Sequence, residues 1–274
     1  MAVTERFSNR VENYARYRPR YPAELAGFLT EQCGLDATSI IADVGSGTGF
    51  LAELFLQNGN QVFGIEPNKE MREAAERLLA DYPRFNSLAA TAEATMLADQ
   101  SVDFVTAGQA FHWFDRESCR REFARILRPR GWVALVWNDR HTDTTPFLVA
   151  YEQLLRDFGT DYDQVNHKRI DVAVIREFFG TEPKVKTFPN HQHFDFPALR
   201  GRLLSSSYVP ESGQPRYEEM LAALTSLFEA HQKNGKVTFD YDTVIYASRV
   251  TNFLTSTASI PADRMACMPK SVSS

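Results

Sequence analysis

The sequence has little cysteine and no close cysteine pair. Its three cysteines, Cys33, Cys119 and Cys267, lie far apart, and none belongs to a Cys-x-x-Cys motif. We interpret them as reduced thiols in packing positions rather than as metal ligands or catalytic nucleophiles. His191 and His193 lie two residues apart, but no third ligand is close to them in the sequence. We therefore expect no bound metal.

Net positive charge and long apolar runs are also missing. The chain has 30 Lys and Arg residues against 35 Asp and Glu residues, a formal net charge of -5. Because nucleic acids and anionic membranes attract proteins through basic faces, this balance argues against either as a partner. No stretch reaches the roughly 18 apolar residues that span a bilayer, and the N-terminus lacks an apolar leader. We expect a cytoplasmic protein without an obligate protein partner.

Chain length and apolar content indicate the class of fold. With 274 residues, of which 43% are hydrophobic and 12% aromatic, the chain can bury a large core in one α/β domain with an insertion or a cap. Helical patterns alternate with short apolar strands through its first half. This alternation predicts a doubly wound, largely parallel sheet.

One stretch organises the rest of the chain. An apolar, β-branched run at 40–44 ends with Asp43 and Val44 and is followed by Gly45, Gly47 and Gly49, before a helical pattern begins. The pattern predicts a strand that turns tightly into a helix, where a ligand lies against the backbone near the positive end of that helix. A dinucleotide fingerprint would need a third glycine at Phe50.

A second acid extends this pattern. The next short strand, at 61–65, ends at Glu66, where a carboxylate can accept hydrogen bonds from both hydroxyls of a ribose. Residues 43–49 followed by 64–68 resemble the first two motifs of the class I S-adenosylmethionine-dependent methyltransferases. The resemblance implies a Rossmann-like, seven-stranded, mostly parallel sheet with helices on both faces and a helical lid insertion. It also implies cofactor contacts at Asp43, Gly45, Ser46, Gly47, Gly49, Glu66 and Pro67.

Two further stretches are similar to cofactor-binding segments of that family. Thr91-Ala92-Glu93 corresponds to the turn that binds adenine, but Thr91 stands where an aspartate is common. Adenine recognition is therefore left to Thr91, the Ala92 backbone or Glu93. After the fourth strand, Gln109 corresponds to a position near the methionine portion of the cofactor.

The N-terminal arm and the segment after Gln109 resemble the small-molecule branch related to trans-aconitate methyltransferase. In that branch tyrosine and arginine of the arm enclose the amino-acid end of the cofactor, which implies this role for Tyr14 and Arg18. The alternative is an arm that only packs on the domain. His112 is either a catalytic base or a structural histidine. The Trp113 ring either lies beside the sulfonium of the cofactor or faces the core.

The remaining sequence divides into an insertion, a pair of strands and a tail. We predict the arm and cofactor-binding core at 1–137, a helical lid that binds the acceptor at 138–235, a closing β-hairpin at 236–250 and a loosely ordered tail at 251–274. Within the insertion, arginines and hydroxyls converge at 200–210, either as helix capping and surface charge or as a site that suits a carboxylate. A Ser-Ser-x-Tyr segment lies in the lid of the resembled branch, so we predict acceptor contacts at Arg202, Ser207 and Tyr208, together with Trp113.

The predicted function is direct, in-line methyl transfer from S-adenosylmethionine to a small molecule, which we expect to be a carboxylic acid or a comparable metabolite. Two alternatives remain at this stage. A regulatory protein that binds the cofactor without catalysis would keep every cofactor motif. An NAD-dependent oxidoreductase would share the strand, glycine loop and acid, although Phe50 argues against it.

Overall fold

A single seven-stranded sheet is the centre of the molecule. The computed structural model describes residues 10–160, 162 and 171–249, and the strand order in its sheet is β3-β2-β1-β4-β5-β7-β6. Strands β1 to β5 are parallel, whereas β7 runs antiparallel to both β5 and β6. The seven-stranded, mostly parallel sheet that the sequence predicted is thus confirmed. The strands are β1 (Ile40–Val44), β2 (Gln61–Ile65), β3 (Phe85–Leu88), β4 (Val102–Gly108), β5 (Leu127–Arg140), β6 (Lys184–Phe194) and β7 (Val237–Ser248).

Helices cover both faces of this sheet. Because successive strand residues point to opposite faces, Ile41 packs with α2 and α3, whereas Ala42 packs on the other side with α5 and α8. None of the described helices is long and apolar enough to cross a membrane. The helices are α1 (Val11–Tyr17), α2 (Glu24–Cys33), α3 (Phe50–Gln57), α4 (Lys69–Leu78), α5 (Arg116–Ile126), α6 (Pro146–Phe158), α8 (Val172–Phe179), α9 (Phe196–Leu204) and α10 (Tyr217–His231).

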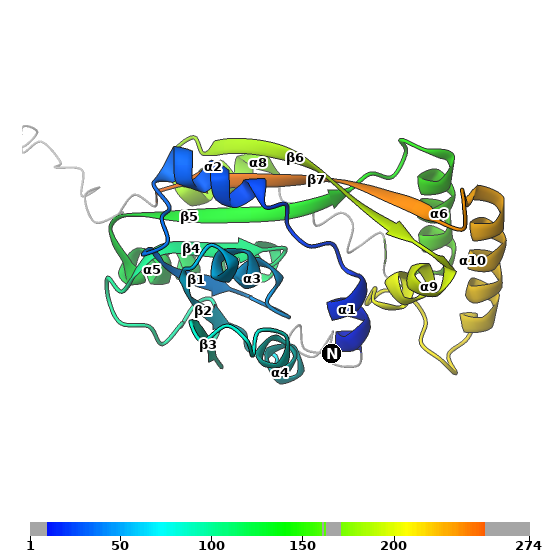
Figure 1. Cartoon of the computed structure of the whole chain (residues 1–274), viewed down its shortest axis with the longest axis horizontal. Coiled ribbons are helices and arrows are strands. Elements are labelled where there is room, and N and C mark those ends of the chain that lie inside the picture. The colour runs from blue at the N-terminus through cyan, green and yellow to red at the C-terminus, as the bar shows by residue number, and fades with distance from the viewer. Residues whose placement is uncertain (1–9, 161, 163–170, 250–274) are drawn as a thin grey trace, which may run out of the picture.

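Strands β6 and β7 continue past the rest of the sheet and carry α6, α9 and α10 at their far end (Figure 1). A second apolar core forms there around Phe239 of β7, which is fully buried. Its ring contacts Phe147 and Tyr151 of α6, at centroid distances of 5.1 and 4.8 Å, and Phe194 of β6 at 5.4 Å. We call α6, α9 and α10 together the helical cap.

The predicted closing hairpin at 236–250 is wrong. Residues Val237–Ser248 form one strand of 12 residues, and its antiparallel neighbour β6 comes from inside the insertion. The buried and half-buried residues of β7 alternate without a change of phase on either side of Asp242. Asp242 occupies an outward position of a continuous strand, so it does not mark a turn.

The cysteines that the structure describes are buried or half-buried. Cys119 is fully buried and Cys33 half-buried, and both are free thiols. Burial raises the pKa of Cys33 to about 11 and also raises the pKa of Cys119, so neither is a reactive thiolate at neutral pH. Cys267 and the predicted tail at 251–274 lie outside the described residues.

The N-terminal arm crosses from the sheet to the helical cap. Helix α1 contacts α9 and α4 and lies between the core and the cap in Figure 1. The Tyr17 ring occupies the space where a Cβ at Gly201 of α9 would be, so the two helices approach closely. Asn138 donates to the Pro19 carbonyl at 3.3 Å and Asn190 to the Arg20 carbonyl at 2.8 Å. These contacts attach the arm through residues 17–20, directly after α1 and at its last turn.

Candidate functional site

The glycine loop after β1 is held against β2. The Gly45 and Ser46 amides both donate to the Ile65 carbonyl, at 2.8 and 3.1 Å. Gly45, Gly47 and Gly49 have φ angles of 66°, 55° and 87°, in the region that favours glycine. A Cβ at Gly45 or Gly49 would collide with Ala110 or Leu79, whereas a Cβ at Gly47 would meet nothing within 4 Å. Gly47 therefore faces open space in which a ligand can lie against the backbone.

Glu66 joins this loop to the end of β2. The Gly47 amide donates to its Oε2 and the Asn68 amide to its Oε1, both at 2.9 Å. The side chain is 9% exposed. Burial raises the pKa of Glu66, and the two amides oppose that shift. Each oxygen of a carboxylate can accept more than one hydrogen bond, so Glu66 retains capacity for the ribose hydroxyls.

Asp43 lies beneath the same loop and is fully buried. Its Oδ1 accepts a hydrogen bond from the Thr106 hydroxyl at 3.0 Å, and its Oδ2 has no hydrogen-bond partner among the described residues. Burial raises the pKa of Asp43 to about 7. The Thr106 hydroxyl and the Ala52 amide, in the first turn of α3, oppose this shift, so Asp43 connects β1 to the helix that follows the loop. The residues around the loop thus suit the predicted cofactor.

The three adenine candidates differ in availability. Glu93 Oε1 accepts a hydrogen bond from the Asp115 amide at the start of α5, at 3.1 Å, and lies 3.6 Å from Cys119 Sγ. Ala92 is buried and Thr91 exposed. Because the Glu93 carboxylate already accepts a hydrogen bond at the start of α5, it is the least available of the three for binding adenine.

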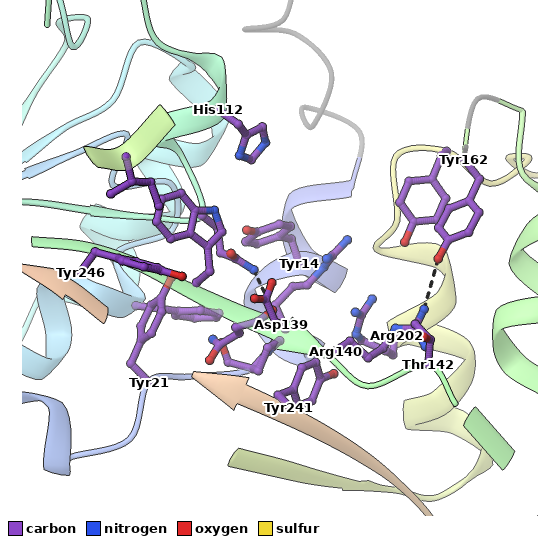
Figure 2. Close-up of a pocket in the computed structure, with 18 residues that line it drawn as sticks. Tyr14, Tyr21, His112, Asp139, Arg140, Thr142, Tyr162, Arg202, Tyr241 and Tyr246 are labelled. Atoms are coloured by element: carbon purple, nitrogen blue, oxygen red, sulfur yellow. Dashed lines mark hydrogen bonds between the residues drawn. The ribbon is translucent and has the colours of Figure 1, made fainter. Parts of the chain in front are cut away.

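A cavity of about 330 Å³ lies between the sheet and the helical cap. Figure 2 shows His112 and Tyr246 on the side of the sheet and Arg140, Arg202 and Tyr162 on the opposite side. Six of the predicted site residues meet in its lining: Tyr14, Arg18, Gln109, His112, Arg202 and Tyr208.

The predicted residues of the glycine loop, the end of β2 and the adenine turn lie outside this cavity, and so do two of the four predicted acceptor-binding residues, Trp113 and Ser207. The Trp113 ring packs against His112 at a centroid distance of 4.6 Å, on the 3-10 turn Phe111–Trp113. Ser207 is also outside the lining, whereas Ser205 and Ser206 contact Arg202. Helix α9 ends at Leu204 with Ser205 as its C-cap, so Ser206 and Ser207 belong to the turn that follows the helix.

Arg18 and Arg202 form the cationic end of the cavity. Arg18 donates from Nε to Ser205 Oγ and from Nη2 to Ser205 O, both at 3.1 Å. Arg202 is 5% exposed and donates from Nη1 to Ser205 Oγ at 3.5 Å and to Ser206 Oγ at 3.3 Å. Burial and the neighbouring charge of Arg202 lower the pKa of Arg18. Neither arginine forms an ion pair with a carboxylate among the described residues. Two positively charged groups therefore share the Ser205 hydroxyl oxygen as an acceptor.

Arg140 belongs to the same cavity but is paired. Its Nη2 donates to Glu152 Oε2 at 2.6 Å and to the Tyr162 hydroxyl at 3.3 Å, and Tyr162 donates to the same Glu152 oxygen at 2.6 Å. Burial, together with the hydrogen bond to Glu152, raises the pKa of Tyr162, so Tyr162 remains a donor.

Sequence reasoning missed several lining residues. Asn138 and Arg140 lie at the end of β5, just past residue 137 where the predicted core ends, and Tyr241 lies at an inward position of β7. The position of Asn138 and Arg140 after a buried parallel strand was a usable signal, because ligands bind at that edge of such sheets. In the described part of the chain, no group of three or more His, Cys, Asp or Glu residues is placed to hold a metal.

Comparisons with known proteins agree with this arrangement. Residues 42–135 match the model of a methyltransferase domain. An uncharacterized methyltransferase-like protein of Schizosaccharomyces pombe is 33% identical over 246 residues, covering 88% of this chain and 94% of that protein. An uncharacterized methyltransferase of Mycobacterium bovis is 39% identical over 134 residues, which are 49% of this chain and 52% of that protein.

The fold also has a solved counterpart. The structure of a protein from Anaeromyxobacter dehalogenans, assigned as a type II methyltransferase, has a TM-score of 0.65 and 23% identity. The match covers 85% of this chain and 98% of that one. At this level of identity the likeness concerns the fold alone. The sequence matches, in contrast, favour the predicted methyltransferase over the oxidoreductase and the regulatory protein.

Proposed function

Because this chain belongs to the class I S-adenosylmethionine-dependent methyltransferases, we propose that it methylates a small carboxylic acid in the cavity below the helical cap. In this proposal the glycine loop, Asp43 and Glu66 hold the cofactor. Tyr14, Gln109 and His112 lie where the loop side meets the cavity, and Arg202 and Tyr208 bind the acceptor.

The choice of acceptor rests on Arg18 and Arg202, which have no carboxylate partner within the described part of the chain. Two guanidinium groups that share Ser205 repel each other, and burial makes that repulsion stronger than it would be in water. An anion between them would relieve the repulsion, and guanidinium groups match the two oxygens of a carboxylate. The hydroxyl of Tyr208, which also lines the cavity, can add a donor to the same anion.

A carboxylate acceptor makes few chemical demands on the protein. S-adenosylmethionine supplies an activated methyl group, which a carboxylate oxygen takes while the carbon–sulfur electron pair returns to sulfur, giving a methyl ester and S-adenosylhomocysteine. No proton is released, so no base is required, and the protein contributes mainly by aligning the reactants. The ester has lost the charge that held the acid between Arg18 and Arg202, and this loss favours product release.

The test is a methylation assay that measures S-adenosylhomocysteine formed with a panel of carboxylic acids and, separately, their amides. The acids should be methylated, and Arg202→Gln should raise the KM for the acid by about tenfold or more. The affinity for S-adenosylhomocysteine alone, measured by calorimetry, should stay within about twofold. Arg216→Gln is the matched control, because Arg216 is exposed and pairs with Glu219 away from the cavity lining. Turnover of amides or amines in place of acids would overturn the proposal.

A further inference from the structure

The cationic groups of the cavity are not equivalent. Arg140, Arg18 and Arg202 all line it, but only Arg140 has a carboxylate partner among the described residues, namely Glu152. Glu152 is buried and lies behind Arg140, outside the lining. Its Oε2 accepts hydrogen bonds from both Arg140 and Tyr162 at 2.6 Å. The charge of Arg140 is therefore neutralised from the protein side.

Arg140 is nevertheless close enough to serve a ligand that also contacts Arg202. The guanidinium carbons of Arg140 and Arg202 lie 6.0 and 5.9 Å from the centroid of the same ring, Phe239. An acid held by Arg18 and Arg202 could thus extend a second carboxylate toward Arg140. Glu152 prevents Arg140 from offering a full positive charge to this second carboxylate.

The formal charges of this region add up to a single positive charge among the described residues. The lining contains three arginines and one carboxylate, Asp139, and Glu152 supplies a second carboxylate behind it. Arg156 also pairs with Glu152, at 3.6 Å, but its side chain is 56% exposed and lies outside the lining, so water screens its charge and it is not counted. The cavity can therefore compensate one carboxylate of an acceptor. A second would be taken out of water without a full counter-charge, which is costly.

We propose that Glu152, by neutralising Arg140, is the residue that restricts the acceptor to acids with one carboxylate. This inference rests on the proposed function. Glu152 acts through Arg140 and is a positioning residue that does not itself touch the acceptor.

The experiment compares three acids of six carbons that differ in charge: hexanoic, adipic and tricarballylic acids. Methylation is measured as S-adenosylhomocysteine formed, and binding by calorimetry with S-adenosylhomocysteine present. The wild-type protein should prefer hexanoate, and Glu152→Gln should shift the ratio of kcat/KM, or of affinities, toward adipate by about tenfold. Glutamine keeps an oxygen that can accept the Tyr162 hydrogen bond.

Removing one charge of a buried pair can weaken the fold, so the double variant Arg140→Gln with Glu152→Gln completes the test. It removes both charges and should return the hexanoate-to-adipate ratio to the wild-type value. A purely structural role would lower all rates without moving the ratio, because the ratio does not depend on the folded fraction. Glu219→Gln makes the same chemical change in an exposed pair on α10 and should leave the ratio unchanged.

Two outcomes separate the hypotheses. A wild-type preference for adipate or tricarballylate, or an unchanged ratio in Glu152→Gln, overturns the role of Glu152 while acid methylation stands. If the wild-type protein neither binds nor methylates any of the three acids, the proposed function fails and this inference fails with it.

Discussion

The Gly47 amide donates a hydrogen bond to the Glu66 carboxylate over 2.9 Å, although the two residues follow different strands. The loop after β1 and the acid after β2 therefore form one unit at the shared edge of the sheet. A ligand that binds Glu66 also meets the open space above Gly47, so changes at either residue should affect the same affinity.

Gly47→Val and Glu66→Ala should each weaken binding of S-adenosylhomocysteine by about tenfold or more. Valine would need a φ near 55° that a β-branched residue rarely adopts, and its side chain would enter the ligand space. Alanine at position 66 removes an acceptor of charge-assisted hydrogen bonds. Calorimetry measures both effects. Gly27→Val is the control, because Gly27 lies in α2 with no atom near its missing Cβ. Undiminished affinity in both variants would refute the cofactor site.

Asp43 should make stability depend on pH. Burial raises the pKa of Asp43 to about 7 in the folded state, from 3.8. Between these values the folded protein binds more protons than the unfolded chain, so the free energy of unfolding should fall as pH rises from 4 to 7. In Asp43→Asn, the fall in the free energy of unfolding between pH 4 and pH 7 should be smaller by on the order of a few kcal/mol. Urea unfolding at pH 5, 6 and 7 measures it, and an equal slope in the variant would contradict the burial argument. Glu66, whose pKa burial also raises, adds to the slope in the same direction.

The arrangement of the glycine loop, Asp43 and Glu66 could be predicted from the sequence because its determinants are local. Strand, glycine loop and helix follow one another in residues 40–57, and parallel strands bring Asp43 and Glu66 to one edge without further information. Arg202 could also be predicted, since arginines and hydroxyls gather near the end of one helix.

The rest of the cavity depends on contacts between residues far apart in the sequence. Strand β6 pairs Lys184 with Ala247 and Phe194 with Val237, and no local pattern encodes that register. The register follows from packing of Phe194 on Phe239 in the second core. The position of Tyr241 follows in turn from this pairing. Tyr162 comes from a stretch without periodicity, so no sequence signal placed it beside Arg140.

The close approach of Tyr17 to Gly201 predicts that a larger residue in α9 displaces the arm. Gly201→Val cannot be accommodated beside the Tyr17 ring, and overpacking of this kind costs about 1 to 3 kcal/mol. The arm should then open more often, which limited trypsin digestion detects as faster cleavage after Arg16 or Arg20. Arg18 would lose its contacts with Ser205, so the KM for the acid should rise as well. Wild-type cleavage rates in this variant would show that α1 is not held by α9.

His112 lines the cavity, so its replacement tests whether the reaction needs a base. A carboxylate attacks without losing a proton, whereas a phenol or an amine gains about 10²- to 10⁴-fold from a general base. For an acid acceptor, His112→Asn should therefore reduce kcat by less than about tenfold. The pH profile of kcat should also have the same shape in the wild type and the variant, so that the substitution removes no inflection near the ordinary pKa of histidine, about 6.5. Trp113→Phe is the matched control for packing, because the two rings contact each other. A pH-dependent loss of more than about 100-fold in kcat, with Trp113→Phe unaffected, would show that His112 acts as a base. A carboxylate oxygen would then be excluded as the methyl acceptor.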